Sequence, residues 1–308
     1  MKHALRTLTA AIIAAVGVSA SLSAQPQVFQ FFVSATSADG MPVSDLKTDD
    51  VVMAENGERQ KVTKVEPFSV PMKLTIAIDN GLESGDAIAQ YRTGLTGLIQ
   101  ALPPDVEITI ITTAPQPRTV VKPTTNRDEI LKGLTQFAPE SARPRFSDAI
   151  VEFSKRLQNE AKDKKAAPYL PVMVMVSTAA IETRSYQPDE IQKAVQYLIT
   201  RKAKVNAIVA STRPGAVQLA DKDLTQASSV AVPVTKATGG RYEALAVASR
   251  LATLLPEWGK DLAALHARQA TQFRVTVERT RSGELQKPTI EIARPGLSGT
   301  VTIDGYLP

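Results

Sequence analysis

The clearest candidate for chemistry is an acidic residue that follows directly on a short apolar run. Residues 74–78 are almost wholly apolar, and Asp79 comes next, followed by Asn80 and Glu83. A buried strand that ends in an acidic residue places its carboxylate at the carboxyl edge of the sheet, where open α/β sheets bind their ligands. These three residues therefore predict a binding site at that edge.

Groups for nucleophilic or general-base catalysis are scarce. The sequence holds two histidines, and His3 lies in a segment expected to be removed, which leaves His266 for any serine triad. His266 falls on the last turn of an expected helix, where a histidine is commonly a surface residue near the carbonyl end. In residues 81–85 the serine stands one place late for a Gly-x-Ser-x-Gly elbow. We therefore expect no catalytic residues and no enzyme activity.

Cofactor motifs are also missing from the sequence. No Gly-x-Gly-x-x-Gly follows an apolar run, and no Gly-Lys-Ser/Thr loop occurs. The sequence has no cysteine, which excludes disulfides and thiolate metal sites. We expect no cofactor. Paired carboxylates for hydrolysis stay an open alternative, because such pairs need not be close in the chain.

The first residues have the order of a secretory signal peptide. Lys2 and Arg6 precede an apolar run over residues 8–18, and small residues follow up to Ala24. The run is shorter than the ~20 residues that a membrane span needs. We expect residues 1–24 to be a signal peptide, with Ala20 as the alternative cleavage point, and the mature chain to be periplasmic or secreted without a stable membrane anchor.

The net charge does not favour nucleic acid as a partner. The formal net charge of +5 falls by two, to +3, when Lys2 and Arg6 leave with the signal peptide. This value is small for a chain of this length, whereas nucleic-acid binding domains carry strong basic patches. We expect a protein partner and no nucleic acid.

Short apolar runs alternate with amphipathic stretches over residues 71–267. The runs are typical of strands covered on both faces, and the stretches between them have the 3.6-residue period of helices. This alternation predicts an α/β domain with a doubly wound, mainly parallel sheet. The expected strands are residues 74–78, 106–111, 172–176, 205–209 and 241–243, and the expected helices are residues 88–102, 146–157, 188–199 and 245–266.

The two ends of the mature chain have the two-residue period of β-strands. Phe29, Phe31 and Val33 alternate with other residues near the start, and Val275 and Val277 do so near the end. Each end is too short to bury a core alone. We therefore expect residues 25–70 and residues 268–308 to pair into one small β-sandwich.

The strand that ends in Asp79, its position after a β segment and the sheet pattern resemble the von Willebrand factor A fold. A closer resemblance, to the VWFA-related exported bacterial family, covers nearly the whole mature chain. It is carried at the front by residues 33–46 and 50–57, and at the end by residues 288–292, 294–297 and 305–306. The resemblance implies an adhesion-type module whose metal site begins with the motif Asp-x-Ser-x-Ser.

Most of the metal ligands that the resemblance implies are replaced in this sequence. Asp79 matches the motif, but its two serine positions fall on Gly81 and Glu83. The threonine of the family falls on or beside Pro144, and the second aspartate falls on Thr178. One carboxylate holds a divalent cation weakly, because the ion keeps almost all its water. We expect a degenerate metal-ion-dependent adhesion site without a metal, although Glu83 could restore a weak one.

The sequence thus favours an exported, non-catalytic protein-interaction module that works without a metal ion. The expected partner-binding edge lies on loops that follow the core strands and precede the helix at residue 146. It consists of Asp79, Asn80, Glu83, Arg145, Phe146 and Thr178. The alternatives are an envelope hydrolase that uses carboxylates and a purely structural component of an envelope assembly.

Overall fold

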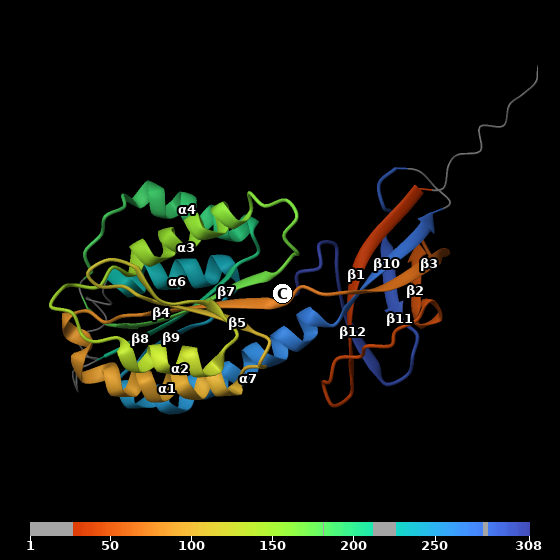
Figure 1. Ribbon diagram of the computed structural model, residues 1–308. Coiled ribbons are helices and arrows are strands. Elements are labelled where there is room, and N and C mark those ends of the chain that lie inside the picture. The colour runs from red at the N-terminus through yellow and green to blue at the C-terminus, as the bar shows by residue number, and fades with distance from the viewer. Residues whose placement is uncertain (1–26, 181, 212–225, 280–282) are drawn as a thin grey trace, which may run out of the picture.

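The computed structural model describes residues 27–180, 182–211, 226–279 and 283–308 (Figure 1). The described residues form two six-stranded sheets and six α-helices, so the protein is of the mixed α/β class. One sheet carries the helices, and the other lies beyond the end of α7. The expected signal peptide, residues 1–24, lies outside the described residues.

The helix-bearing sheet has the strand order β6-β5-β4-β7-β8-β9. Pairing is parallel from β5 through β4, β7 and β8 to β9, and β6 runs antiparallel to β5. The order reverses direction between β4 and β7, so the loops after these two strands flank the point where open sheets bind ligands. The strands are β4 (Met72–Ile78), β5 (Glu107–Thr112), β6 (Arg118–Thr124), β7 (Leu170–Thr178), β8 (Lys204–Ala210) and β9 (Tyr242–Leu245).

Helices cover both faces of this sheet. In Figure 1, α3, α4 and α6 lie on one face, and α1, α2 and α7 lie on the other. Alternate residues of β4 enter separate apolar clusters: Ile76 packs on the α1 and α7 side, and Ala77 packs on the α3 side. The helices are α1 (Ile88–Ala101), α2 (Arg127–Gln136), α3 (Phe146–Glu160), α4 (Pro188–Thr200), α6 (Gln226–Thr238) and α7 (Leu251–Ala270).

The second sheet combines strands from both ends of the chain. Its order is β11-β2-β3-β10-β1-β12, and all of its pairs are antiparallel. The late strand β10 therefore lies between the early strands β1 and β3, and Phe31, Val33 and Val275 are fully buried beneath them. The strands are β1 (Gln27–Ser37), β2 (Val51–Glu55), β3 (Glu58–Phe68), β10 (Gln272–Arg279), β11 (Pro288–Ile292) and β12 (Leu297–Thr302).

Hydrogen bonds tie the two sheets together where α7 runs into β10. The Val70 N–H donates to the Gln269 carbonyl at 3.0 Å, and the Leu307 N–H donates to Gln269 Oε1 at 2.8 Å. Gln272 Nε2 donates to the Gly305 carbonyl at 2.9 Å. The last residues of the sequence therefore pack into the joint between the two parts.

His266 is not the surface residue that the sequence suggested. It is 3% exposed, and its Nδ1 accepts a hydrogen bond from the Met72 N–H at 3.2 Å. Its Nε2 lies 3.0 Å from Asp105 Oδ2. Because Nδ1 is an acceptor, the neutral ring carries its proton on Nε2 and donates it to Asp105. His266 thus fixes α7 against the start of β4 and the loop before β5.

Among the described residues, none of the helices combines the length and the apolar character that a bilayer span requires.

Candidate functional site

The carboxylate of Asp79 lies buried just past the end of β4 and accepts four hydrogen bonds. Asp79 is 1% exposed. Its Oδ1 accepts from the Gly81 N–H at 2.8 Å, and its Oδ2 accepts from the Thr178 N–H at 2.9 Å. The hydroxyls of Thr178 and Ser177 donate to Oδ2 at 2.6 and 3.2 Å. Burial, and then the charge of Asp79, raises the pKa of Tyr91 well above its ordinary value.

Asn80 connects two further loops, at Ala114 and at Ala138, to the carboxyl end of β4. Its Oδ1 accepts from the Ala114 N–H at 2.9 Å, and its Nδ2 donates to the Ala138 carbonyl at 3.1 Å. The Glu140 N–H donates to the Asn80 carbonyl at 2.7 Å. The chain from residue 138 onwards is therefore held across the carboxyl end of β4.

Pro144 lies directly against Gly81, the position where the resemblance implies a serine ligand. A Cβ on Gly81 would stand 2.8 Å from Pro144 Cδ and 3.0 Å from the Ala142 carbonyl oxygen. The Leu82 N–H donates to that same carbonyl at 2.8 Å. A serine side chain at position 81 would therefore clash with residues 142–144 unless they moved.

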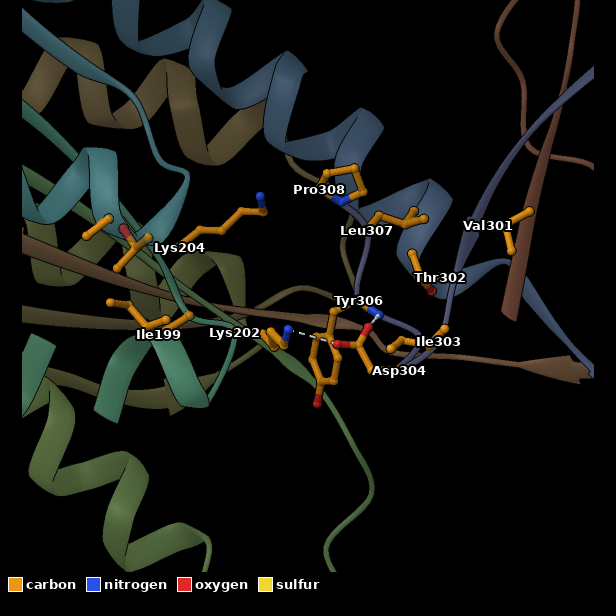
Figure 2. Close-up of a pocket in the computed structure, with 13 residues that line it drawn as sticks. Ile199, Lys202, Lys204, Val301, Thr302, Ile303, Asp304, Tyr306, Leu307 and Pro308 are labelled. Atoms are coloured by element: carbon orange, nitrogen blue, oxygen red, sulfur yellow. Dashed lines mark hydrogen bonds and ion pairs between the residues drawn. The ribbon is translucent and has the colours of Figure 1, made fainter. Parts of the chain in front are cut away.

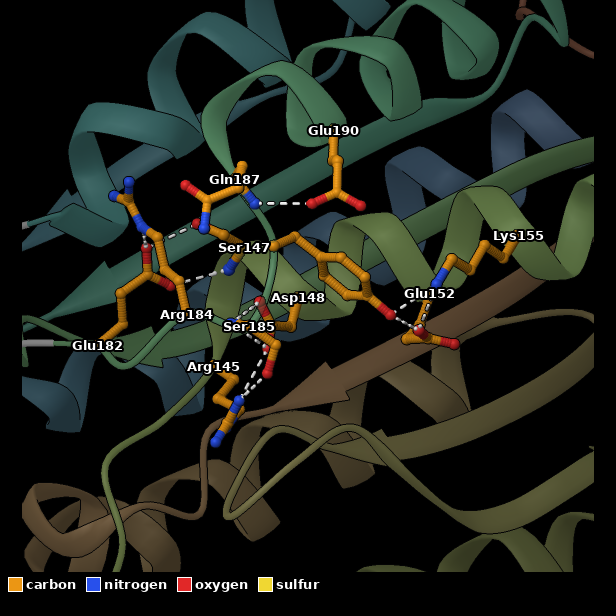
Figure 3. A network of polar contacts seen from close by, with 11 residues as sticks. Arg145, Ser147, Asp148, Glu152, Lys155, Glu182, Arg184, Ser185, Gln187 and Glu190 are labelled. Atoms are coloured by element: carbon orange, nitrogen blue, oxygen red, sulfur yellow. Dashed lines mark hydrogen bonds and ion pairs between the residues drawn. The ribbon is translucent and has the colours of Figure 1, made fainter.

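A carboxylate from the loop after β7 caps the start of α3 (Figure 3). Glu182 accepts from the Ser147 N–H at 2.8 Å, from the Ser147 hydroxyl at 2.6 Å and from Arg184 Nε at 2.7 Å. Its side chain is fully buried. A carboxylate at a helix N-terminus satisfies free N–H groups and is favoured by the helix dipole. Glu182 therefore joins the β7–α4 loop to α3.

Asp148 also connects the start of α3 to the β7–α4 loop. Both of its carboxylate oxygens accept from the Ser185 N–H at 3.0 Å, and Oδ2 pairs with Arg145 Nη1 at 3.2 Å. Arg145 also donates to the Ser185 hydroxyl. Arg145 therefore already has an ion-pair partner within the protein, as Figure 3 shows.

The structure brings the six predicted residues to one edge but leaves few of them accessible. We call this surface the strand-end edge, formed by residues 79–87, 138–148, 178–180 and 182–187. Glu83 is exposed and Arg145 is partly exposed. The remaining four, Asp79, Asn80, Phe146 and Thr178, are at most 2% exposed.

The expectation that these buried residues touch a partner needs correction. Phe146 packs in the apolar cluster with Ala77 and Met175, because the first turn of α3 lies on the sheet. Polar side-chain atoms of Asp79, Asn80 and Thr178 form hydrogen bonds with one another and with the surrounding loops. Their role is to hold the strand-end edge in shape.

Three further accessible side chains at this edge, those of Leu82, Arg143 and Arg184, were not among the predicted binding residues. Leu82 is 62% exposed. Arg143 and Arg184 are also exposed, and they come from the two loops that pack against residues 79–82. For Arg184 and Glu182, the sequence indicated only that they lie in a polar loop after a buried strand.

The residues of the strand-end edge do not fit a divalent cation. Both oxygens of Asp79 already accept hydrogen bonds, and Pro144 covers Gly81. Mg²⁺ requires near-octahedral oxygen ligands at short range, and the hydroxyls nearest to Asp79 donate to it. Among the described residues, no three or more His, Cys, Asp or Glu side chains are grouped to hold a metal.

We expect Gly81→Ser, which restores one ligand of the family motif, to lower stability without creating a metal site. The new Cβ would overlap the Pro144 ring and the Ala142 carbonyl, and such overpacking costs about 1–3 kcal/mol. Gly85→Ser is the matched control, because nothing lies within 4 Å of a Cβ at that position. Urea unfolding and calorimetric titration with Mg²⁺, Mn²⁺ and Ca²⁺ measure both effects. Saturable uptake of an ion by the Gly81→Ser protein would contradict the expectation.

Comparisons with known proteins give distant likenesses only. No family model matches the sequence, and no curated protein does. A von Willebrand factor type A protein from Catenulispora acidiphila is similar at 9% identity and a TM-score of 0.48, covering 89% of this chain and 72% of its own. BatB from Bacteroides thetaiotaomicron is similar at 11% identity and a TM-score of 0.44, covering 62% and 98%. The SpRpn10 VWA domain is similar at 13% identity and a TM-score of 0.40, covering 59% and 94%. Two of these three structures are named as von Willebrand factor A proteins or domains, and likenesses this distant say nothing of function.

Proposed function

We propose that this chain is an exported, non-catalytic protein-interaction module that binds a protein partner at the strand-end edge without a metal ion. The observation that supports the proposal is that the chain itself fills this edge. Pro144 covers Gly81, and four donors saturate Asp79. What remains for a partner is the outer surface of three loops.

The exposed residues on these loops suit direct contact with a protein. Leu82 offers an apolar side chain that is 62% exposed, and Glu83, Arg143 and Arg184 place both signs of charge near it. Arginine is enriched in protein interfaces, and opposite charges across an interface set orientation and association rate. A partner would therefore cover Leu82 and pair with the surrounding charges.

Buried ties behind this surface keep the loops in one arrangement. Glu182 and Asp148 hold the β7–α4 loop on α3, and Asn80 holds residues 138–140 on β4. Loops that are ordered before binding lose little conformational entropy when a partner arrives.

In this proposal the α/β part is a doubly wound domain, and the terminal β segments form a small sandwich beside it. The mature protein is periplasmic or secreted.

The test compares capture of partners from the envelope fraction by two mature variants. We expect Leu82→Asp with Arg143→Glu to reduce recovery of the specific partner by about tenfold or more, since an interface hot spot contributes about 2 kcal/mol. The control is Lys162→Glu with Ala166→Asp, which makes the same change of net charge in the exposed turn that follows α3.

Recovery by the unmodified protein should be the same with and without EDTA. A partner captured equally by both variants would show that binding uses another surface. A partner lost on chelation would show that binding needs a metal ion.

A further inference from the structure

A second candidate site lies away from the strand-end edge, at the joint between the two sheets (Figure 2). It is a pocket of about 600 Å³ between the end of α4, the start of β8, the end of α6 and the last residues of the sequence. Pockets for small molecules in proteins range over about 300–1,000 Å³. The pocket is therefore large enough for a small organic ligand.

Most of its wall is apolar. Ile199 comes from α4, and Val301, Ile303 and Leu307 come from the end of the chain. Ile303 is 80% exposed and Val301 is 38% exposed, so apolar side chains that a ligand could cover now face water. Covering such surface is favourable in proportion to its area.

One cation in the pocket has a partner and another has none. Lys202 Nζ pairs with Asp304 Oδ2 at 2.9 Å. Lys204 also lines the pocket, yet no hydrogen bond or ion pair reaches its ammonium from the part of the chain that the structure describes. In Figure 2 its side chain extends through the pocket toward Pro308.

Within the described part of the chain, no carboxylate forms an ion pair with Lys204, and Asp304 of the same pocket pairs with Lys202 instead. Burial, and then the nearby positive charge of Arg268, lowers the pKa of Lys204. A half-buried ammonium that loses water without gaining an anion is unfavourable. A bound anion would supply the missing partner and would also be attracted by Arg268.

We propose that this pocket binds a small amphipathic anion, whose carboxylate or phosphate head pairs with Lys204 and whose apolar chain lies on Ile199, Val301 and Ile303. The charged hydrogen bond fixes the head, since such bonds are among the stronger ones in proteins. The apolar wall selects against inorganic anions, which have no chain to cover it. This site is independent of the function proposed for the strand-end edge.

The test is calorimetric titration of the mature protein with decanoate, decyl phosphate, decanol and inorganic phosphate, all below micellar concentration. We expect saturable binding of decanoate or decyl phosphate, and binding at least about tenfold weaker for decanol and for inorganic phosphate. Which of the two anions binds more tightly identifies the head group.

Three variants assign the binding to the pocket. Lys204→Met keeps an unbranched side chain one atom shorter and removes the charge, and should weaken binding about tenfold, as expected for a lost charged hydrogen bond. Ala237→Trp, at an exposed position that lines the pocket, should block it. Lys132→Met, at an exposed position on α2, should change nothing.

Thermal unfolding of each variant confirms that it is folded before titration. Two results would overturn the proposal: absence of saturable binding by both anions, or equal affinity in folded Lys204→Met and unmodified protein.

Discussion

Replacing Asp79 with alanine is expected to lower the free energy of unfolding by about 3–5 kcal/mol. The carboxylate is buried and accepts hydrogen bonds from the N–H groups of Gly81 and Thr178 and from two hydroxyls. Each buried donor left without an acceptor costs about 1–3 kcal/mol. Urea unfolding followed by the fluorescence of Trp258, the single tryptophan, measures the change.

The sign of this change separates two roles for Asp79. A carboxylate held in place for a cation is uncompensated when no cation is bound, so its removal would stabilise the metal-free protein. Removal of a carboxylate that accepts hydrogen bonds from its own chain would instead lower the stability of the metal-free protein. Unchanged or higher stability of Asp79→Ala in EDTA would therefore refute the structural role. Glu83→Ala, an exposed carboxylate nearby, is the control and should change stability by no more than about 0.5 kcal/mol.

The central strands of the α/β part could be predicted from the sequence because both of their faces are covered. The expected strands at residues 74–78, 106–111, 172–176 and 205–209 coincide with β4, β5, β7 and β8 to within a few residues. Strands between two helical layers need apolar residues at nearly every position, which makes the pattern plain.

The elements between residues 112 and 146 could not be predicted in this way. β6 (Arg118–Thr124) is the edge strand of its sheet, and Val121 is its one buried residue. α2 (Arg127–Gln136) buries only Ile130, Gly133 and Leu134. Elements at the rim of a domain need few apolar residues, so their sequences resemble loops.

The segment around residue 245 shows how a periodic pattern can mislead. We expected one helix over residues 245–266, but Leu245 ends β9 and pairs with Ala210. The helix α7 begins only at Leu251. Leu245 fits the helical period by chance. Nothing in the local sequence shows that it pairs with a neighbouring strand instead.

The position of the candidate site followed from the sequence, but its accessibility did not. Asp79 at the end of an apolar run located the edge, because strand ends are set by local pattern. The covering of that edge by residues 138–145 depends on Asn80 contacting Ala138 and on Pro144 contacting Gly81. Both contacts join residues about sixty positions apart, and no spacing rule links them.

The second large effect is expected in the terminal sheet, where Val275→Asp should lower the free energy of unfolding by at least about 4 kcal/mol. Val275 is fully buried on β10 and lies opposite Phe31 on β1 and Val65 on β3. The substitution removes a buried apolar side chain and puts a charge among apolar neighbours. Because β10 joins strands from the start of the chain, the damage should spread to both of its ends.

Thr276→Asp is the matched control for this substitution. Thr276 is the next residue of β10, lies opposite Gln30 and Lys64, and is partly exposed. An aspartate there faces polar neighbours and should cost about 1 kcal/mol or less. Urea unfolding by circular dichroism and size-exclusion chromatography compare the two variants, with aggregation expected for Val275→Asp alone, since unpaired strands become exposed. Equal stability of the two variants would show that the early and late strands do not share a core.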